Sequence, residues 1–277
     1  MVSWGSRSRC AEAPAPPDDG PPNPTFAIGL ERQLAARLDG TTRILVDAGL
    51  THEALAGELA NLKLGFQDLA AVFATHAHGD HLGCAGKVSR REKIPMIVSE
   101  DAARSTPMIL RLKLHSRFAP APSSRSARFR ILTIPLSHDA PGTVACVLES
   151  GGARFGLATD LGRSSAALEG ALAECDAFLL EFNHDEGLLR EGPYPWRLKR
   201  RVLGDEGHLS NAQAAAALAN ALGARVRHVL LGHLSEINNR PELALEAARS
   251  VVARAGRGDV AVAVAPRGEA APQISIP

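Results

Sequence analysis

The distribution of apolar residues along the chain changes near Gly40. Before this residue the chain is rich in proline and polar residues, and after it short apolar runs of strand length alternate with stretches of helical periodicity. A proline- and serine-rich loop is expected at residues 120–126. In the first half, strands are expected at residues 43–47, 70–75 and 95–99, and helices at residues 51–63 and 101–110.

Closely spaced apolar runs in the middle of the chain predict antiparallel strands. Three runs follow one another at residues 129–135, 143–150 and 153–159, and Gly151-Gly152 supplies the two-residue turn of a hairpin. Further strands are expected at residues 177–182, 227–231 and 260–265, and helices at residues 211–222 and 241–255. Because antiparallel hairpins and helix-separated strands occur together, we predict an α+β sandwich of two mixed β-sheets flanked by helices.

Length and composition limit the number of domains. A chain of 277 residues with 45% hydrophobic residues can form one large domain or two small ones. Residues 12–24 contain too much proline and too few apolar side chains to pack. We therefore predict a partly flexible N-terminal segment with a proline-rich insertion at residues 1–40, and a folded domain at residues 41–277.

Charge, hydropathy and cysteine usage predict a cytoplasmic protein. No stretch approaches the roughly 18–20 apolar residues of a membrane helix, and no apolar region follows Arg7 and Arg9, so neither a membrane span nor a secretory signal is expected. The four cysteines are scattered without a C-x-x-C pair, as is usual in a reducing compartment. A net charge of +1 excludes strong attraction of the whole molecule to nucleic acid and leaves room for a local basic patch.

The segment with the clearest chemistry is ATHAHGDHLG at residues 74–83, directly after an apolar strand. It places His76, His78, Asp80 and His81 within six positions. Imidazole and carboxylate groups suit borderline cations such as zinc, and alternate side chains of an extended segment share one face. The turn through Gly79 would let Asp80 and His81 fold back. The segment therefore predicts a metal-binding loop that serves two ions.

Three more metal donors are expected at strand ends, because one loop cannot complete two coordination shells. His138, Asp160 and His233 each follow a predicted strand, where sheets of this kind place functional groups. Taken singly, each has an ordinary explanation: Asp139 or Asp160 could be a turn or helix-cap residue, and His233 a polar loop residue. Four separate strand-end sites that agree favour the metal site.

The string HAHGDH at residues 76–81, followed in order by His138, Asp160 and His233, resembles the metallo-β-lactamase superfamily. The strings LATDLG (157–162), LEFNHD (180–185), GPYPWRLKRRVLGDEGHLSN (192–211) and GHLSEINNRPELA (232–244) are similar to the YycJ/WalJ family of metal-dependent hydrolases and DNA exonucleases. The resemblance covers roughly residues 41–265 and implies that the domain at 41–277 is a metallo-β-lactamase-fold (αββα) hydrolase with a two-metal site.

The resemblance also implies roles for individual residues. The first ion is expected on His76, His78 and His138, the second on Asp80, His81 and His233, with Asp160 bridging the two. Glu181 and His208 fall where nuclease branches of the superfamily carry catalytic groups near the scissile phosphate. His184 and Asp47 are further candidates for side chains that support a ligand. Zinc is the metal expected, with manganese and iron as alternatives.

A basic cluster with two aromatic neighbours is a candidate nucleic-acid contact. It comprises Arg197, Lys199, Arg200 and Arg201, with Tyr194 and Trp196 beside them. Cations would bind the phosphate backbone and aromatic rings would stack on unpaired bases. A solvated helix face with buried aromatics is the general alternative for such a run, and its nearness in sequence to His208 favours substrate contact.

The first functional hypothesis is a dinuclear metal-dependent phosphodiesterase, most specifically a DNA exonuclease. Asp80 or Asp160 would orient a metal-activated water, and His208 would protonate the leaving oxygen or merely precede a helix capped by Ser210 or Asn211. One alternative is a small-molecule hydrolase acting on a thioester, lactone or cyclic nucleotide, because a fold does not determine its substrate. A metal-binding regulatory protein with little turnover is the other alternative. A nuclease should have an open groove bordered by the basic cluster, and a thioesterase a small closed pocket without it.

Overall fold

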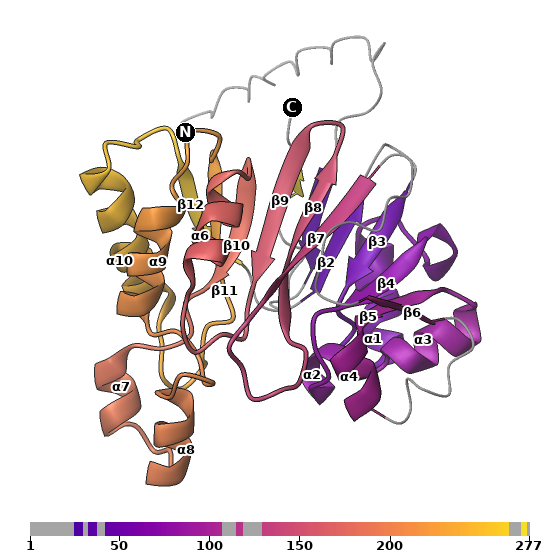
Figure 1. Ribbon diagram of the computed structural model, residues 1–277, viewed down its shortest axis with the longest axis horizontal. Coiled ribbons are helices and arrows are strands. Elements are labelled where there is room, and N and C mark those ends of the chain that lie inside the picture. The colour runs from indigo at the N-terminus through magenta and orange to yellow at the C-terminus, as the bar shows by residue number, and fades with distance from the viewer. Residues whose placement is uncertain are drawn as a thin grey trace, which may run out of the picture.

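The computed structural model describes residues 25–29, 33–37, 42–106, 115–118, 129–265 and 273–275. Two β-sheets pack face to face, and helices cover the outer face of each sheet (Figure 1). Both sheets contain parallel and antiparallel pairs. The predicted αββα sandwich of two mixed sheets is confirmed.

The first sheet has the order β13-β1-β2-β3-β4-β5-β6 among the described residues. Neighbours from β13 to β3 pair antiparallel and neighbours from β3 to β6 pair parallel. The sequence analysis assigned no strand before residue 43, and β1 and β2 lie inside the segment at 1–40. The strands are β1 (Thr25–Gly29), β2 (Gln33–Arg37), β3 (Arg43–Val46), β4 (Ala71–Ala74), β5 (Met96–Ser99), β6 (His115–Phe118) and β13 (Gln273–Ser275).

The second sheet has the order β12-β11-β10-β9-β8-β7. Neighbours from β12 to β9 pair parallel and the hairpins β9-β8-β7 pair antiparallel. Gly151 and Gly152 have φ of 59° and 89°, so the expected hairpin turn uses the left-handed conformations that glycine adopts readily. The strands are β7 (Phe129–Pro135), β8 (Val144–Ser150), β9 (Ala153–Ala158), β10 (Ala177–Glu181), β11 (His228–Gly232) and β12 (Ala261–Val264).

Helices form the outer layers. In Figure 1, α1, α3 and α4 lie against the first sheet, α6, α9 and α10 lie against the second, and α7 and α8 project at one end. Within the described ranges, no helix is both long and apolar enough to cross a bilayer. The helices are α1 (His52–Asn61), a 3₁₀ turn η1 (Phe66–Asp68), α2 (Gly79–Leu82), α3 (Ala85–Glu92), α4 (Glu100–Ser105), α6 (Ala166–Ala173), α7 (Glu186–Glu191), α8 (Trp196–Val202), α9 (Asn211–Ala221) and α10 (Pro241–Arg254).

The predicted elements agree with the structure to within one or two residues, apart from one helix. The helix expected at residues 101–110 is α4, which Ser99 caps and which ends at Ser105. Thr106 is extended, with φ −122° and ψ 94°, because the next residue is Pro107 and its ring disfavours a helical conformation before it. The predicted loop at 120–126 and the proline-rich residues 12–24 lie outside the described residues.

Three apolar clusters hold the layers together. One fills the space between the sheets, a second lies between the first sheet and its helices, and a third lies between the second sheet and its helices. Strand β8 contributes to two of them, because Cys146 and Leu148 point toward the other sheet while Ala145 and Val147 point toward the helices. This packing fixes the strand ends that carry the candidate site.

Candidate metal centre

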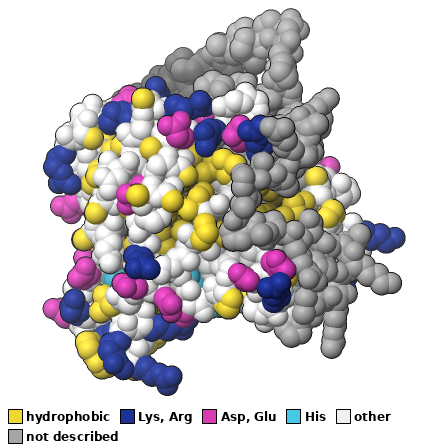
Figure 2. All heavy atoms as spheres, viewed as in Figure 1, with side chains coloured by type: hydrophobic (Ala, Val, Ile, Leu, Met, Phe, Trp, Pro, Cys, Tyr) yellow, Lys and Arg dark blue, Asp and Glu magenta, His cyan; other side chains and the backbone are white. Residues whose placement is uncertain are grey.

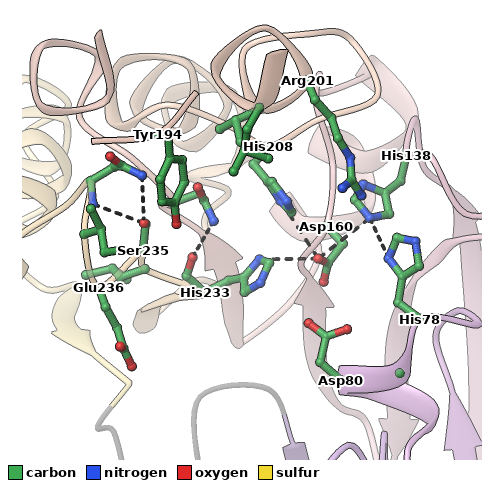
Figure 3. Close-up of a pocket in the computed structure, with 17 residues that line it drawn as sticks. His78, Asp80, His138, Asp160, Tyr194, Arg201, His208, His233, Ser235 and Glu236 are labelled. Carbon is green, nitrogen blue, oxygen red and sulfur yellow. Dashed lines mark hydrogen bonds and ion pairs between the residues drawn. The ribbon is translucent and has the colours of Figure 1, made fainter. Parts of the chain in front are cut away.

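The candidate donors meet at the carboxyl ends of strands from both sheets. His76 follows β4 in the first sheet, and in the second sheet His138 follows β7, Asp160 follows β9 and His233 follows β11. Figure 3 shows the side chains of His78, His138, Asp160 and His233 pointing toward one another. The packing of the two sheets thus brings together residues that lie up to 157 positions apart in sequence.

The loop after β4 turns into a short helix rather than an irregular turn. His78 is the N-cap residue of α2, so Asp80 and His81 lie in its first turn, with Asp80 exposed and His81 fully buried. The backbone of this helix packs tightly on the loop after β3, where a Cβ atom at Gly49 would lie 1.6 Å from the carbonyl oxygen of Asp80. A glycine at position 49 is therefore needed for the metal loop to take this path.

Three residues of the centre have left-handed backbone conformations. Asp47, Asp160 and His233 have φ of 61°, 63° and 57°, which is uncommon for residues other than glycine and is found preferentially at functional sites. Hydrogen bonds hold each one: the Asp47 carboxylate accepts from Thr75, the Asp160 amide donates to Glu181, and Asn183 donates to the His233 carbonyl. These backbones turn the side chains toward a common centre.

The potential ligand atoms form two triads that share Asp160 as a neighbour. His76, His78 and His138 each offer an atom within 4.8 Å of the other two, and so do Asp80, His81 and His233. Asp160 lies between the triads: its Oδ2 is 3.1 Å from His81 Nε2, and its Oδ1 is 3.5 Å from His233 Nδ1 and 3.9 Å from His138 Nε2. The structure brings all seven expected ligands into one cluster.

The donor atoms fit a pair of divalent cations. His76 Nε2 is buried and makes no hydrogen bond to any described residue, while His81 Nε2 and Asp160 Oδ2 are buried and face each other at 3.1 Å. Buried polar atoms without partners are rare in native proteins, and an ion is a common reason for them. Imidazole nitrogen with carboxylate oxygen is a donor set that suits zinc and similar cations. The fit therefore rests on both the chemistry and the orientation of these atoms.

Three of these groups are held in the protonation state that binds a metal. Burial lowers the pKa of His76 to about 3 and also lowers the pKa of His138, so both imidazoles are neutral near pH 7. Burial opposes ionisation of Asp160, but the charges of His233 and His81 prevail and hold its pKa well below the usual range. These are the ligand forms of histidine and aspartate.

His81 behaves in the opposite way. Burial lowers its pKa, but the carboxylates of Asp160 and Asp47 on either side outweigh this effect and raise the pKa well above the ordinary value. A cation bound at His81 Nε2 would therefore replace a proton. Occupation of the second triad is consequently expected to release a proton.

Two fully buried carboxylates stand behind the donors. Asp47 Oδ2 lies 2.8 Å from His81 Nδ1 and 2.8 Å from Thr75 Oγ1, so it orients the imidazole through the nitrogen that faces away from Asp160. Glu181 lies 2.7 Å from His233 Nδ1 and 3.2 Å from His208 Nδ1. Glu181 is not among the described residues that line the pocket, so its place is behind the site rather than beside a substrate.

A cavity of about 570 Å³ opens in front of the donors. Figure 3 shows Arg201 reaching toward His138 on one side and Tyr194 on another wall. Of the six residues expected to contact nucleic acid, only Tyr194 and Arg201 are among the described lining residues. Arg197, Arg200 and Trp196 are exposed on α8, and Lys199 donates to the carbonyl of Arg190. Figure 2 shows cationic side chains gathered at the end of the molecule where α7 and α8 lie.

The site contains residues that the sequence analysis left aside. Asn183 lines the cavity and fixes the His233 carbonyl, and Asp139 lies 3.4 Å from both His78 Nε2 and His138 Nε2. His184, which the sequence analysis named as a candidate for supporting a ligand, is fully buried, is not among the described lining residues, and has no described hydrogen-bond partner at either ring nitrogen. Asn183 lies in the LEFNHD string, but no rule of spacing marks it as a residue that fixes the backbone of another strand end.

Comparison with known families agrees with this geometry. A family model described as "Beta-lactamase superfamily domain" matches residues 42–234, a range that includes every donor named above. The chain belongs to this superfamily. Members of the metallo-β-lactamase fold bind divalent metal ions, and the two triads with Asp160 provide groups able to bind them.

Two relatives are similar to this chain in sequence, and one solved structure is similar to it in fold. The chain is 30% identical over 219 residues to Exodeoxyribonuclease YycJ of Bacillus anthracis (78% of this chain, 83% of the relative). It is 34% identical over 207 residues to Exodeoxyribonuclease WalJ of Streptococcus pneumoniae serotype 2 (73% of this chain, 77% of the relative). The metallo-β-lactamase fold protein YhfI from Bacillus subtilis superposes with a TM-score of 0.67 at 16% identity, covering 90% of this chain and 99% of that one. The chain is therefore a metal-dependent hydrolase of this superfamily.

Proposed function

We propose that this hydrolase is a dinuclear phosphodiesterase that removes nucleotides from DNA ends. The observation that carries the proposal is that one cavity is lined by Asp160 and by members of both donor triads, together with a cation at Arg201 and an aromatic ring at Tyr194. The names of the relatives, both exodeoxyribonucleases, support the same substrate class.

The proposed ligand sets follow the two triads. His76, His78 and His138 would hold the first ion, Asp80, His81 and His233 would hold the second, and Asp160 would contribute to both. Two divalent cations supply a bound water of lowered pKa and neutralise charge on phosphoryl oxygens. Zinc is the metal proposed, with manganese and iron as alternatives for this donor set.

The protein's own side chains bind and orient the substrate. Arg201 binds a phosphate oxygen and Tyr194 stacks on a base, because both line the cavity that contains the donors. Asp80 is exposed toward the cavity and accepts a hydrogen bond from the attacking water, which fixes its direction.

His208 is the proposed proton donor to the leaving oxygen. Its ring lines the cavity, while its Nδ1 atom lies 3.2 Å from Glu181, which keeps the imidazole in one orientation. Ser210 caps the following helix through the amide of Gln213, so the helix start does not depend on the side chain of His208. That leaves the imidazole available for chemistry.

The test is cleavage of end-labelled duplex and single-stranded DNA by the zinc-reconstituted protein. We expect stepwise loss of terminal nucleotides and a loss of at least about 100-fold in rate for His78→Ala and Asp80→Ala, which remove one ligand each. Matched controls are His228→Ala, at the opposite end of β11 from His233, and Asp101→Ala, in the first turn of α4. Cleavage that survives in the ligand variants at the control rate would refute the proposal.

A small-molecule hydrolase is the second candidate, and one observation favours it. Only Arg201 of the four basic-cluster residues lines the cavity among the described residues. The cavity is therefore bordered by fewer cations than the sequence led us to expect for a nuclease. A cyclic nucleotide, a thioester and a lactone should be assayed beside DNA. A kcat/KM for one of them that exceeds the value for DNA would move the assignment to this candidate.

A further inference from the structure

Asp139 lies between a histidine of the candidate metal centre and the cation of the cavity wall. Its Oδ1 atom is 3.4 Å from His78 Nε2 and 3.4 Å from His138 Nε2, and its Oδ2 atom is 2.5 Å from Arg201 Nε. The side chain is one-quarter exposed. No other described carboxylate contacts both a member of the triads and a member of the basic cluster.

The contact with His78 has the geometry of a carboxylate that orients a metal ligand. His78 Nδ1 lies 3.3 Å from His138 Nε2 and so faces the interior of the first triad, which leaves Nε2 on the opposite side of the ring for Asp139. Asp47 and Glu181 face His81 Nδ1 and His233 Nδ1 at shorter hydrogen-bond distances, 2.8 Å and 2.7 Å, whereas Asp139 Oδ1 is 3.4 Å from His78 Nε2 and equally far from His138 Nε2. Carboxylates behind ligand histidines fix the ring orientation and raise its basicity.

The contact with Arg201 explains why this residue lines the cavity and the other three cations of α8 do not. The loop after β7 is joined to the segment after α8 by three contacts: Ser137 Oγ with the Asp205 carbonyl at 2.7 Å, the Asp139 amide with the Glu206 carbonyl at 3.2 Å, and His138 Nδ1 with the Gly207 carbonyl at 3.2 Å. Asp139 uses only the Nε atom of Arg201 among the described contacts. The terminal guanidinium nitrogens therefore stay available for an anion.

We propose that Asp139 is a positioning residue that couples the metal centre to the anion site, orienting His78 with Oδ1 and holding Arg201 with Oδ2. A phosphate bound in front of the first triad then meets a guanidinium whose rotamer is already fixed, so less side-chain entropy is lost on binding. The phosphate part of this inference rests on the proposed function. Its metal part does not.

The charge-removing variant Asp139→Asn tests both contacts, with Asp205→Asn as the matched control on the neighbouring loop, where the side chain is exposed. In competition with a chelator, Asp139→Asn should bind zinc about 10-fold more weakly, and Asp205→Asn should match the wild type. This measurement needs no nucleic acid, so its result is independent of whether the protein cleaves DNA. An unchanged zinc affinity would overturn the His78 part.

The Arg201 part is tested with inorganic phosphate bound to the zinc-loaded protein, followed by calorimetry. Arg201→Ala should weaken phosphate binding about 10-fold and Arg200→Ala, which removes an exposed cation one residue away, should not. In the Asp139→Asn background, Arg201→Ala should have a clearly smaller effect, because the guanidinium is no longer held in place. Additive effects would overturn the coupling.

A kinetic readout separates positioning from a structural role. If the protein cleaves DNA, Asp139→Asn should raise KM more than it lowers kcat once zinc is saturating, and a collapse of kcat alone would contradict the assignment. If the wild type cleaves no DNA, the proposed function fails, while the zinc and phosphate measurements still decide the role of Asp139.

Discussion

The Oε2 atom of Glu181 lies 2.7 Å from Nδ1 of His233 and 2.5 Å from the backbone amide of Asp160. The other oxygen, Oε1, accepts from the Leu209 amide at 2.9 Å and lies 3.2 Å from His208 Nδ1. One fully buried carboxylate therefore sets the orientation of two histidines and of the left-handed backbone at Asp160, the proposed bridging residue.

This arrangement predicts a strong effect of Glu181→Gln. The amide keeps the size of the side chain but removes its charge and forces an NH₂ group toward groups that donate hydrogen bonds. We expect a 10- to 100-fold loss of zinc affinity and a comparable fall in kcat, because misplaced supporting groups disturb the ligand they orient. Zinc affinity by chelator competition and steady-state kinetics measure the two effects.

The control for Glu181→Gln is Glu149→Gln. Glu149 is a half-buried residue of β8 whose carboxylate pairs with Arg130 at 3.8 Å, away from the metal centre. Equal losses in both variants would indicate general destabilisation of the second sheet rather than a role of Glu181 at the site.

Substitution at Gly49 should displace the metal loop. Because a Cβ atom at this position would overlap the carbonyl of Asp80, Gly49→Ala should lower the free energy of unfolding by about 1–3 kcal/mol and weaken metal binding. Gly57→Ala is the matched control: its Cβ would lie in open space on α1, where alanine should stabilise the helix by about 0.5–1 kcal/mol. Urea denaturation of both variants measures the difference, and equal effects would contradict the close packing.

Removal of the metal should lower the melting temperature. An ion that binds only the folded protein stabilises it by mass action, by about 2.7 kcal/mol at a free concentration 100 times Kd. Excess chelator should therefore lower Tm in the wild type and have little effect in His78→Ala, which lacks one proposed ligand. Differential scanning calorimetry measures this, and an equal chelator effect in both proteins would argue against a site at His78.

The buried His184 predicts a dependence of stability on pH. Burial lowers its pKa to about 4 from the ordinary 6.5, so between these values the unfolded chain binds a proton that the folded protein does not. The contribution of His184 to the free energy of unfolding is therefore fully present above pH 6.5. It falls by about 3 kcal/mol in total as the pH drops toward 4. Urea denaturation of the chelator-treated protein from pH 7 to pH 5 should show a shallower decline for His184→Gln, and parallel curves would contradict the prediction.

The sequence predicted the sandwich because its strands carry a clear signal. Apolar runs such as residues 143–150 and 153–159 are bounded by turn residues, and their side chains are buried on both faces. Short helices escaped prediction: α2, α7 and α8 span four to seven residues, too few for a periodic pattern to emerge. The strands β1 and β2 pair with each other, β2 also pairs with β3, and β1 also pairs with β13, where Thr25 faces Ser275 from the far end of the chain, a contact that local sequence does not encode.

The candidate metal donors were predictable because four of them follow strand ends, the other three follow His76 closely in sequence, and their side chains have distinctive chemistry. The residues behind them were harder to identify. Asp139 has the sequence signature of a turn residue, and its role emerges only when the loop after β7 meets the end of α8. Four cations of α8 look equivalent in sequence, but the helix turns only Arg201 toward the cavity among the described residues.

The two sheets contribute different numbers of candidate donors, and neither sheet alone supplies a full triad. Residues 42–106 carry His76, His78, Asp80 and His81, and residues 129–265 carry His138, Asp160 and His233, with the Val144 amide donating to the Thr75 carbonyl across the junction at 3.1 Å. Neither half of the polypeptide can assemble a complete triad alone. If these residues hold the ions as proposed, a complete site forms only after the two halves of the polypeptide have docked, and we expect ion binding and hydrolysis only in correctly assembled molecules.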